Sequence, residues 1–305
     1  MLPRLSLQDM VLNLAAVSYT YPHSNRVALS NISYVFRSGT TAIVGPNGAG
    51  KSTLVKLLAG LLAPTSGSIR VHLPSGVSVP PAGMRKAVLF QEPSHLYLTI
   101  RQNITMRYDR APDEDARIYD ALEQAGLARA VEGLPDGIDT LVGAGFGGRV
   151  DLSGGQWQRL ALARLIYQDA PVMVLDEPVA SLDPEGERAV FELFSQMANK
   201  IIIFTTHRYD SIPENTQIIV LVDGRITETG THEELLQRQR NYWSLYMSAS
   251  STARRLPTDK SGAGAACNAH TGLNGSPLHH TPSKGIPPAR AVGGTQHLPK
   301  QRDAS

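Results

Sequence analysis

The sequence predicts an α/β fold built around a parallel β-sheet, and two features carry the prediction. Short, wholly apolar runs at 172–175 and 201–204 are typical of parallel strands buried on both faces. These runs alternate with stretches whose apolar residues recur at helical spacing, as in domains that cover a parallel sheet with helices. With 305 residues, 42% of them hydrophobic, the chain has ample material for a large core.

An earlier strand, predicted at 41–44, runs into a glycine-rich loop, and a helix is expected over 52–62. The leucines of that helix, as far as Leu61, are spaced to cover one face. A further helix is predicted around 118–125, where apolar residues repeat at i, i+3, i+4 and i+7 between a proline and a glycine. The two helices would cover the sheet.

The C-terminal part of the folded region predicts a hairpin and a final helix. Apolar residues 218–222, an Asp-Gly pair and residues 225–227 are typical of a tight β-hairpin, because Asp-Gly accommodates positive φ. Thr231 and Glu234 form a capping-box pattern at the start of one last helix. Its aromatic residues are expected to pack in the core: Tyr242, Trp243 and Tyr246.

Composition divides the chain into a folded domain, 1–248, and a low-complexity tail, 249–305. The tail is rich in Ser, Gly, Ala, Pro and His, and it lacks the large apolar groups that would offset the entropy of ordering, so disorder is predicted. Its histidines fit no metal-ligand spacing. The single cysteine, Cys267, excludes an internal disulfide framework.

Charge and hydropathy argue against a nucleic-acid-binding protein and against a membrane-spanning one. The net charge of +2 does not favour nucleic acid as a partner. The N-terminus lacks the pattern of a signal peptide, and no run of about 18 apolar residues is present. Direct membrane insertion is therefore not expected, and any membrane-spanning part would belong to another chain.

The glycine-rich loop matches the pattern G-x-x-x-x-G-K-[ST] between a predicted strand and a predicted helix. Its glycines let successive N–H groups point at phosphates, and the start of the helix adds partial positive charge. The lysine can reach the β- and γ-phosphates, and the serine hydroxyl can ligate Mg²⁺. The residues expected to bind the nucleotide are Gly45, Pro46, Asn47, Gly48, Ala49, Gly50, Lys51, Ser52 and Thr53.

Two carboxylates follow the apolar run 172–175. Asp176 stands where that strand should emerge at the carboxyl edge of the sheet, the edge at which such sheets bind ligands. It is expected to hold Mg²⁺, through water. Glu177, the next residue, is placed to orient and deprotonate an attacking water.

A second glycine motif narrows the choice among the proteins that bind nucleoside triphosphates with such a loop. Ser153, Gly154, Gly155 and Gln156 precede a predicted helix, so a hydroxyl and backbone N–H groups would form a second anion cradle. One γ-phosphate does not need two cradles in one domain. The motif resembles the signature of ATP-binding cassette (ABC) transporter ATP-binding subunits, in which it faces the ATP held by the other subunit.

The resemblance covers about residues 12–247. It implies a P-loop NTPase (RecA-like) core, an antiparallel β subdomain and an inserted α-helical signature subdomain at about 92–160. It implies ATP and Mg²⁺ as cofactors and assigns roles to further residues. Gln91 would contact Mg²⁺, Asp183 would reach across the dimer, His207 would contact the γ-phosphate, and Tyr21, with Tyr19 as the competing choice, would stack on adenine.

Three details resemble the exporter branch of this family: Arg208 after the histidine, the segment 224–235 and the loop 136–143. Exporters usually carry Glu where Ala144 stands, before a glycine-rich stretch at 145–148, and Thr where Val179 stands. A cassette fused to no membrane domain is a further departure.

The resemblance implies an ATPase coupled to transport, working with a second cassette in a homo- or heterodimer beneath separate transmembrane subunits. The chain is expected to be cytoplasmic and peripheral on the inner face of the cell membrane. An alternative is a soluble ABC ATPase serving repair, translation or assembly, although the tandem cassettes and the long coiled coil of such proteins are missing. A regulatory module that never turns over is a third possibility, which the complete set of catalytic residues disfavours.

Overall fold

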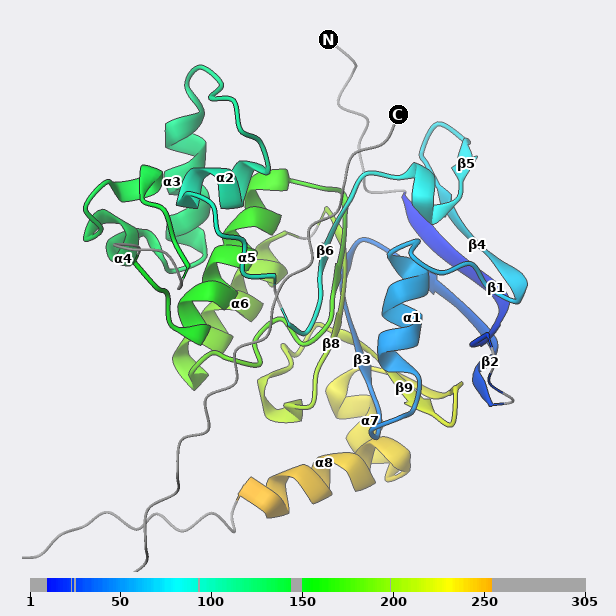
Figure 1. Ribbon diagram of the computed structural model, residues 1–305. Coiled ribbons are helices and arrows are strands. Elements are labelled where there is room, and N and C mark those ends of the chain that lie inside the picture. Colours follow the sequence, from blue (N-terminus) through cyan, green and yellow to red (C-terminus); the bar gives the residue numbers. More distant parts are fainter. Residues whose placement is uncertain are drawn as a thin grey trace, which may run out of the picture. The chain divides into compact units, whose positions relative to one another are not determined.

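The wholly apolar runs form the centre of a six-stranded sheet in the computed structural model (Figure 1), which describes residues 10–22, 24, 26–92, 94–143, 150–197 and 199–253. The order is β10-β9-β3-β8-β7-β6, and all neighbours are parallel except β10 and β9. The α/β prediction is confirmed. The strands are β3 (Gly39–Val44), β6 (Lys86–Leu89), β7 (Val172–Leu175), β8 (Ile201–Thr205), β9 (Gln217–Val222) and β10 (Arg225–Gly230).

A second sheet, antiparallel throughout, lies beyond helix α1 (Figure 1). It corresponds to the predicted antiparallel β subdomain. Its order is β2-β1-β4-β5, with β1 at Val11–Thr20, β2 at Val27–Phe36, β4 at Ser66–His72 and β5 at Ser78–Val79.

Alternation along the central strands divides the core into two layers. Ile43 and Ile203 pack with helix α1 (Lys51–Leu58) and the antiparallel sheet. Their neighbours Ala42 and Ile202 face the opposite way, toward α5 and α6. Because successive side chains of a strand point to opposite faces, both faces of the sheet are covered.

Helices α2 to α5 form the inserted α subdomain, α6 packs on the central sheet, and α7 and α8 make up the C-terminal part. The predicted helix around 118–125 is confirmed, with Ile118, Ala121 and Leu122 buried. The helices are α2 (Ile100–Thr105), α3 (Glu114–Gln124), α4 (Ala128–Glu132), α5 (Gly154–Gln168), α6 (Pro184–Gln196), α7 (His232–Arg238) and α8 (Asn241–Ala253), with short 3-10 turns at Pro81–Gly83, Gly137–Asp139 and Tyr209–Ser211.

The hairpin prediction is confirmed, because Asp223 and Gly224 both have positive φ, 46° and 72°, between β9 and β10. The helix predicted over 52–62 instead ends at Leu58. Gly60 adopts a left-handed conformation with φ 74°, which closes the helix, and Leu61 is 62% exposed rather than buried.

The predicted last helix is two helices. Thr231 caps α7 in a capping box with Glu234, as expected, but Gln239 has φ 51° and separates α7 from α8. Tyr242 is fully buried, whereas Trp243 is exposed and does not pack as predicted. Helix α8 continues to Ala253, beyond the predicted domain boundary at 248.

Several expectations lie outside the described residues: the disorder, the histidines and Cys267 of the tail beyond Ala253, and the glycine-rich stretch with Ala144. Within the described part, no helix combines the length and the apolar character that crossing a bilayer requires.

Candidate functional site

The phosphate-type loop joins β3 to α1, and close backbone contacts explain two of its glycines. A Cβ on Gly45 would lie 2.1 Å from the carbonyl oxygen of Leu221, and one on Gly50 would lie 2.7 Å from that of Ala28. Both residues also have positive φ, 151° and 103°. Only glycine fits these positions, so the loop curls tightly against β9 and β2.

Lys51 is the first residue of α1 and is largely buried. Its ammonium donates hydrogen bonds to the carbonyl oxygens of Gly45 (2.9 Å) and Pro46 (3.1 Å). Burial lowers the pKa of Lys51, and the charges of Glu177 and Asp176 partly oppose that shift. A cation bonded only to neutral carbonyls is well placed to exchange them for a phosphate oxygen.

Thr205, at the end of β8, organises the two carboxylates that follow β7. Its hydroxyl donates to Asp176 Oδ1 (2.6 Å) and accepts the backbone N–H of Glu177 (2.9 Å). Glu177 has φ 51°, a conformation uncommon for a residue other than glycine. Asp176 is thus buried behind the site, while the Glu177 carboxylate is turned toward it.

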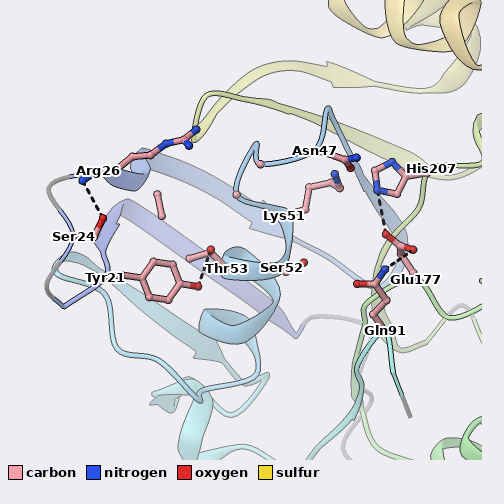
Figure 2. Close-up of a pocket in the computed structure, with 13 residues that line it drawn as sticks. Tyr21, Ser24, Arg26, Asn47, Lys51, Ser52, Thr53, Gln91, Glu177 and His207 are labelled. Atoms are coloured by element: carbon pink, nitrogen blue, oxygen red, sulfur yellow. Dashed lines mark hydrogen bonds and ion pairs between the residues drawn. The ribbon is translucent and has the colours of Figure 1, made fainter. Parts of the chain in front are cut away.

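Glu177 is the meeting point of residues far apart in the sequence (Figure 2). His207 Nε2 lies 3.1 Å from Glu177 Oε1, and Gln91 Nε2 donates to Glu177 Oε2 at 3.2 Å. Burial lowers the pKa of His207, and the nearby charge of Lys51 lowers it further, with Glu177 and Asp176 opposing. The imidazole is therefore neutral at pH 7 and can donate one hydrogen bond.

The lowered pKa of His207 determines in which direction the stability of the fold changes with pH. Because the pKa of His207 in the folded protein lies below its unfolded value of 6.5, the unfolded chain takes up the proton first as pH falls. Folding should therefore lose stability below about pH 6.5. Urea unfolding at pH 5.5 and 7.5 should show that His207→Gln relieves part of the acid-side loss, whereas His72→Gln, on β4, should not. Equal losses in wild type and His207→Gln would contradict the shift.

A cleft of about 370 Å³ runs from this cluster to the antiparallel sheet. Tyr21 lines its far end, is 37% exposed, and shares a 3.0 Å hydrogen bond with the hydroxyl of Thr53. Tyr19 is only 7% exposed, and its ring lies nearly perpendicular to that of Tyr21, with the two ring centroids 4.9 Å apart. Of the two tyrosines, only Tyr21 has a ring available to a ligand in the cleft.

Tyr21→Ala is accordingly expected to weaken ATP binding about tenfold, because the stacking surface is lost. Tyr21→Phe keeps the ring, loses only the bond to Thr53, and should bind nearly as well as wild type. Titration with a fluorescent ATP analogue measures both. Unchanged affinity in Tyr21→Ala would exclude Tyr21 as the adenine platform.

The predicted residues divide into two groups. The cleft is lined by Tyr21, Asn47, Gly48, Gly50, Lys51, Ser52, Thr53, Gln91, Glu177 and His207. Gly45, Pro46, Ala49 and Asp176 lie in the same loop or directly behind it without lining the cleft. The structure does not bring the following residues to the cleft: Ser153, Gly154, Gly155, Gln156 and Asp183.

The second group sits at two helix starts. Ser153 caps α5: its hydroxyl accepts the N–H of Gln156 (3.3 Å), and the Gln156 side chain accepts the N–H of Ser153 (2.8 Å). Asp183 caps α6 by accepting the N–H of Gly186 at 3.1 Å. A Cβ on Gly154 would meet nothing within 4 Å, so this end of α5 is open. This end of α5 lies outside the cleft, and its role as a second anion cradle stays a prediction.

Four residues that line or organise the site were not predicted from the sequence. Thr205 could have been found from the sequence, because it ends an apolar run at the edge where the carboxylates emerge. Ser24, Arg26 and Ala28 line the cleft beside Tyr21, but they precede or begin β2 without any motif that marks them.

Comparison with known proteins places these features in a family. The ABC transporter family model matches residues 29–180. The chain is 40% identical over 242 residues to the nisin transport ATP-binding protein NisT of Lactococcus lactis subsp. lactis, a match covering 78% of this chain and 40% of that protein. It is 41% identical over 238 residues to an ATP-dependent lipid A-core flippase of Burkholderia orbicola (strain AU 1054), covering 76% of this chain and 39% of that protein.

A solved structure, that of a bacterial Atm1-family ABC exporter with ATP bound, superposes with a TM-score of 0.69 at 28% identity. The match covers 82% of this chain and 42% of that chain. The chain thus spans about two fifths of the length of the relatives it matches. It belongs to the ABC transporter family, and its folded part is that family's ATP-binding domain, similar to those of exporters.

Proposed function

We propose that this chain binds Mg-ATP in the cleft, pairs with a second cassette, and drives export through membrane-spanning subunits carried by another polypeptide, at the inner face of the cell membrane. What supports the proposal is that the two predicted anion cradles, the loop at Lys51 and the open start of α5, lie on different surfaces. A lone domain can use only one of them for a given γ-phosphate, whereas a head-to-tail pair uses both.

The residues of the cleft fit a nucleoside triphosphate and its metal. Lys51 and the loop N–H groups would bind the phosphates, and Tyr21 the base. Mg²⁺ prefers oxygen ligands, which Ser52, Asp176 and Gln91 would supply. When bound, the ion would neutralise charge on the phosphates.

Glu177 would act as the general base. Its carboxylate would accept a proton from water as the water oxygen attacks the γ-phosphorus, while ADP leaves with the bridging oxygen. Gln91 holds the carboxylate at Oε2, and the single N–H of neutral His207 can be donated either to Glu177 or, when ATP is bound, to the γ-phosphate.

The composite site can be tested with two inactive variants. Lys51→Ala removes the first cradle's cation, and Gly154→Arg adds a bulky side chain at the start of α5, where a Cβ meets no atom within 4 Å. Each variant alone should be inactive. In an equimolar mixture, half of the dimers are mixed and each has one intact site, so about a quarter of wild-type turnover should return. No recovery, with mixed dimers shown by sedimentation, would refute sharing of the site.

Coupling to a membrane partner needs a separate experiment. The chain, tagged and isolated from native membranes in mild detergent, should bring down a polytopic membrane protein in stoichiometric amount. Isolation of the chain alone, or together with ribosomes or repair factors, would contradict the transport proposal and leave the ATP chemistry standing.

A further inference from the structure

The turn that joins Glu177 to Asp183 connects the base of one site to the residue expected to reach the other cassette. Two backbone hydrogen bonds shape it: Ala180 donates to the carbonyl of Glu177 (3.2 Å), and Leu182 donates to that of Val179 (3.1 Å). These short-range bonds fix the turn locally but do not set its position against the rest of the domain.

Helix α5, which begins with the signature, holds the start of this turn. The buried side chain of Gln158 donates to the carbonyl of Pro178 at 2.6 Å. At the far end, Arg159 Nη2 lies 3.6 Å from Asp183 Oδ1, a weak and partly exposed ion pair. Gly155 lies so close that a Cβ there would stand 3.2 Å from the carbonyl oxygen of Ser181.

The end of the turn is held from another direction by Arg208, the residue after His207. Its Nη1 lies 2.5 Å from Glu187 Oε2 and donates to the carbonyl of Leu182 at 3.4 Å. The Arg208 backbone N–H donates to the hydroxyl of Thr206 at 3.0 Å, which fixes the start of the side chain. One guanidinium therefore joins the histidine segment, the turn and α6.

Burial makes this ion pair consequential. The side chain of Glu187 is 2% exposed, and its Oε1 has no hydrogen-bond partner among the described residues. A buried carboxylate that depends on a single cation is costly to leave unpaired. Arg208 is thus held in one place by Glu187, and it in turn holds the Leu182 carbonyl.

We propose that Arg208 is a positioning residue, which with Glu187 fixes the 178–183 turn and so transmits the state of His207 to Asp183 at the cassette interface. The inference rests on the composite site proposed above. Arg208 does not line the nucleotide cleft, so it should act on pairing and turnover rather than on nucleotide affinity.

The test compares Arg208→Gln, Arg208→Lys and the double variant Arg208→Met/Glu187→Gln. ATP affinity of the monomer should stay within about twofold of wild type, because no cleft contact changes. ATP-driven dimerisation is measured by sedimentation in a Glu177→Gln background and should weaken about tenfold when Arg208→Gln is added. Turnover, measured with Glu177 intact, should fall in Arg208→Gln as well. Arg208→Lys should lose less, because it keeps a charge but not the planar fork.

The double variant separates positioning from stability. It removes the unpaired buried charge, so its melting temperature should recover, while dimerisation and turnover should remain low. Lys200→Met is the control: Lys200 is largely buried, pairs with the exposed carboxylate of Asp169 at 2.6 Å, and stands at the opposite end of β8 from Thr205. It should lose stability without a specific loss of dimerisation.

Hydrogen exchange of residues 178–183 in the nucleotide-free monomer gives a readout that does not depend on ATP turnover. Exchange should rise in Arg208→Gln and in the double variant, and not in Lys200→Met. If wild type neither dimerises nor turns over ATP, the composite site is refuted, but the exchange result still tests whether Arg208 and Glu187 fix the 178–183 turn. Unchanged exchange, or a loss of stability alone as in Lys200→Met, would overturn the role of Arg208.

Discussion

Replacing Glu177 with Gln is expected to lower steady-state ATP turnover by at least about a hundredfold, because the amide cannot accept the proton of the attacking water. ATP binding should stay within about twofold of wild type, since the phosphate loop, Lys51 and Tyr21 are untouched. The Gln side chain is nearly isosteric, so Thr205 should still hold the backbone at this position. With hydrolysis blocked, the ATP-bound dimer should accumulate.

Phosphate release under multiple turnover, ATP titration and sedimentation measure the three quantities. Glu123→Gln, on the exposed side of α3, makes the same chemical change away from the cleft and should behave as wild type. Turnover in Glu177→Gln within a few-fold of wild type would mean that another group takes the proton, and the general base would have to be reassigned.

Lys51→Ala is expected to abolish productive binding, raising the Kd for ATP at least about a hundredfold. The ammonium is the only cation that the loop itself contributes, and its present partners, the carbonyls of Gly45 and Pro46, are neutral. Its removal should not unfold the domain. Burial disfavours the charge of Lys51, as its lowered pKa shows, so the folded state gives up little when that charge is lost.

Isothermal titration with ATP and thermal unfolding test both statements. Lys56→Ala provides the control, because Lys56 lies on the same helix but is exposed. A melting temperature far below wild type would indicate that Lys51 serves the fold, and near-normal ATP affinity would remove it from the phosphate site.

Much of the fold could be predicted because local chemistry and tertiary structure agree. The runs 172–175 and 201–204 are apolar throughout, so they could only be buried strands, and the β9–β10 turn needs positive φ, which Asp223 and Gly224 supply. The cap at Thr231 is equally local. In each case, neighbouring residues determine the conformation.

The errors occurred where distant contacts or single backbone conformations decide the structure. Helical spacing continues through Leu61, but the left-handed Gly60 ends α1 earlier. Gln239, which no sequence pattern marks, breaks the last helix in two. The order of the sheet, with β3 between β8 and β9, is set by packing across the whole domain and is not local.

The site residues also divide into those that a local pattern predicts and those that only the fold brings together. The loop Gly45–Ser52 is contiguous, so its pattern is legible in one segment. The geometry around Glu177, which follows β7, instead requires Gln91 to converge from the end of β6 and Thr205 and His207 from the end of β8. The sequence shows which residues follow these strands, but the distances that make them a cluster come only from the fold.

The most direct test is the specific rate of Mg-ATP hydrolysis by the wild-type chain, measured across protein concentrations from monomer to dimer. A site completed by a second cassette predicts that activity per mole rises with concentration and then levels off, in step with ATP-driven dimerisation seen by sedimentation. Constant activity per mole in the monomer range would contradict the shared site. Absence of turnover at concentrations where ATP binds and dimers form would contradict the assignment of the chain as a hydrolysing cassette.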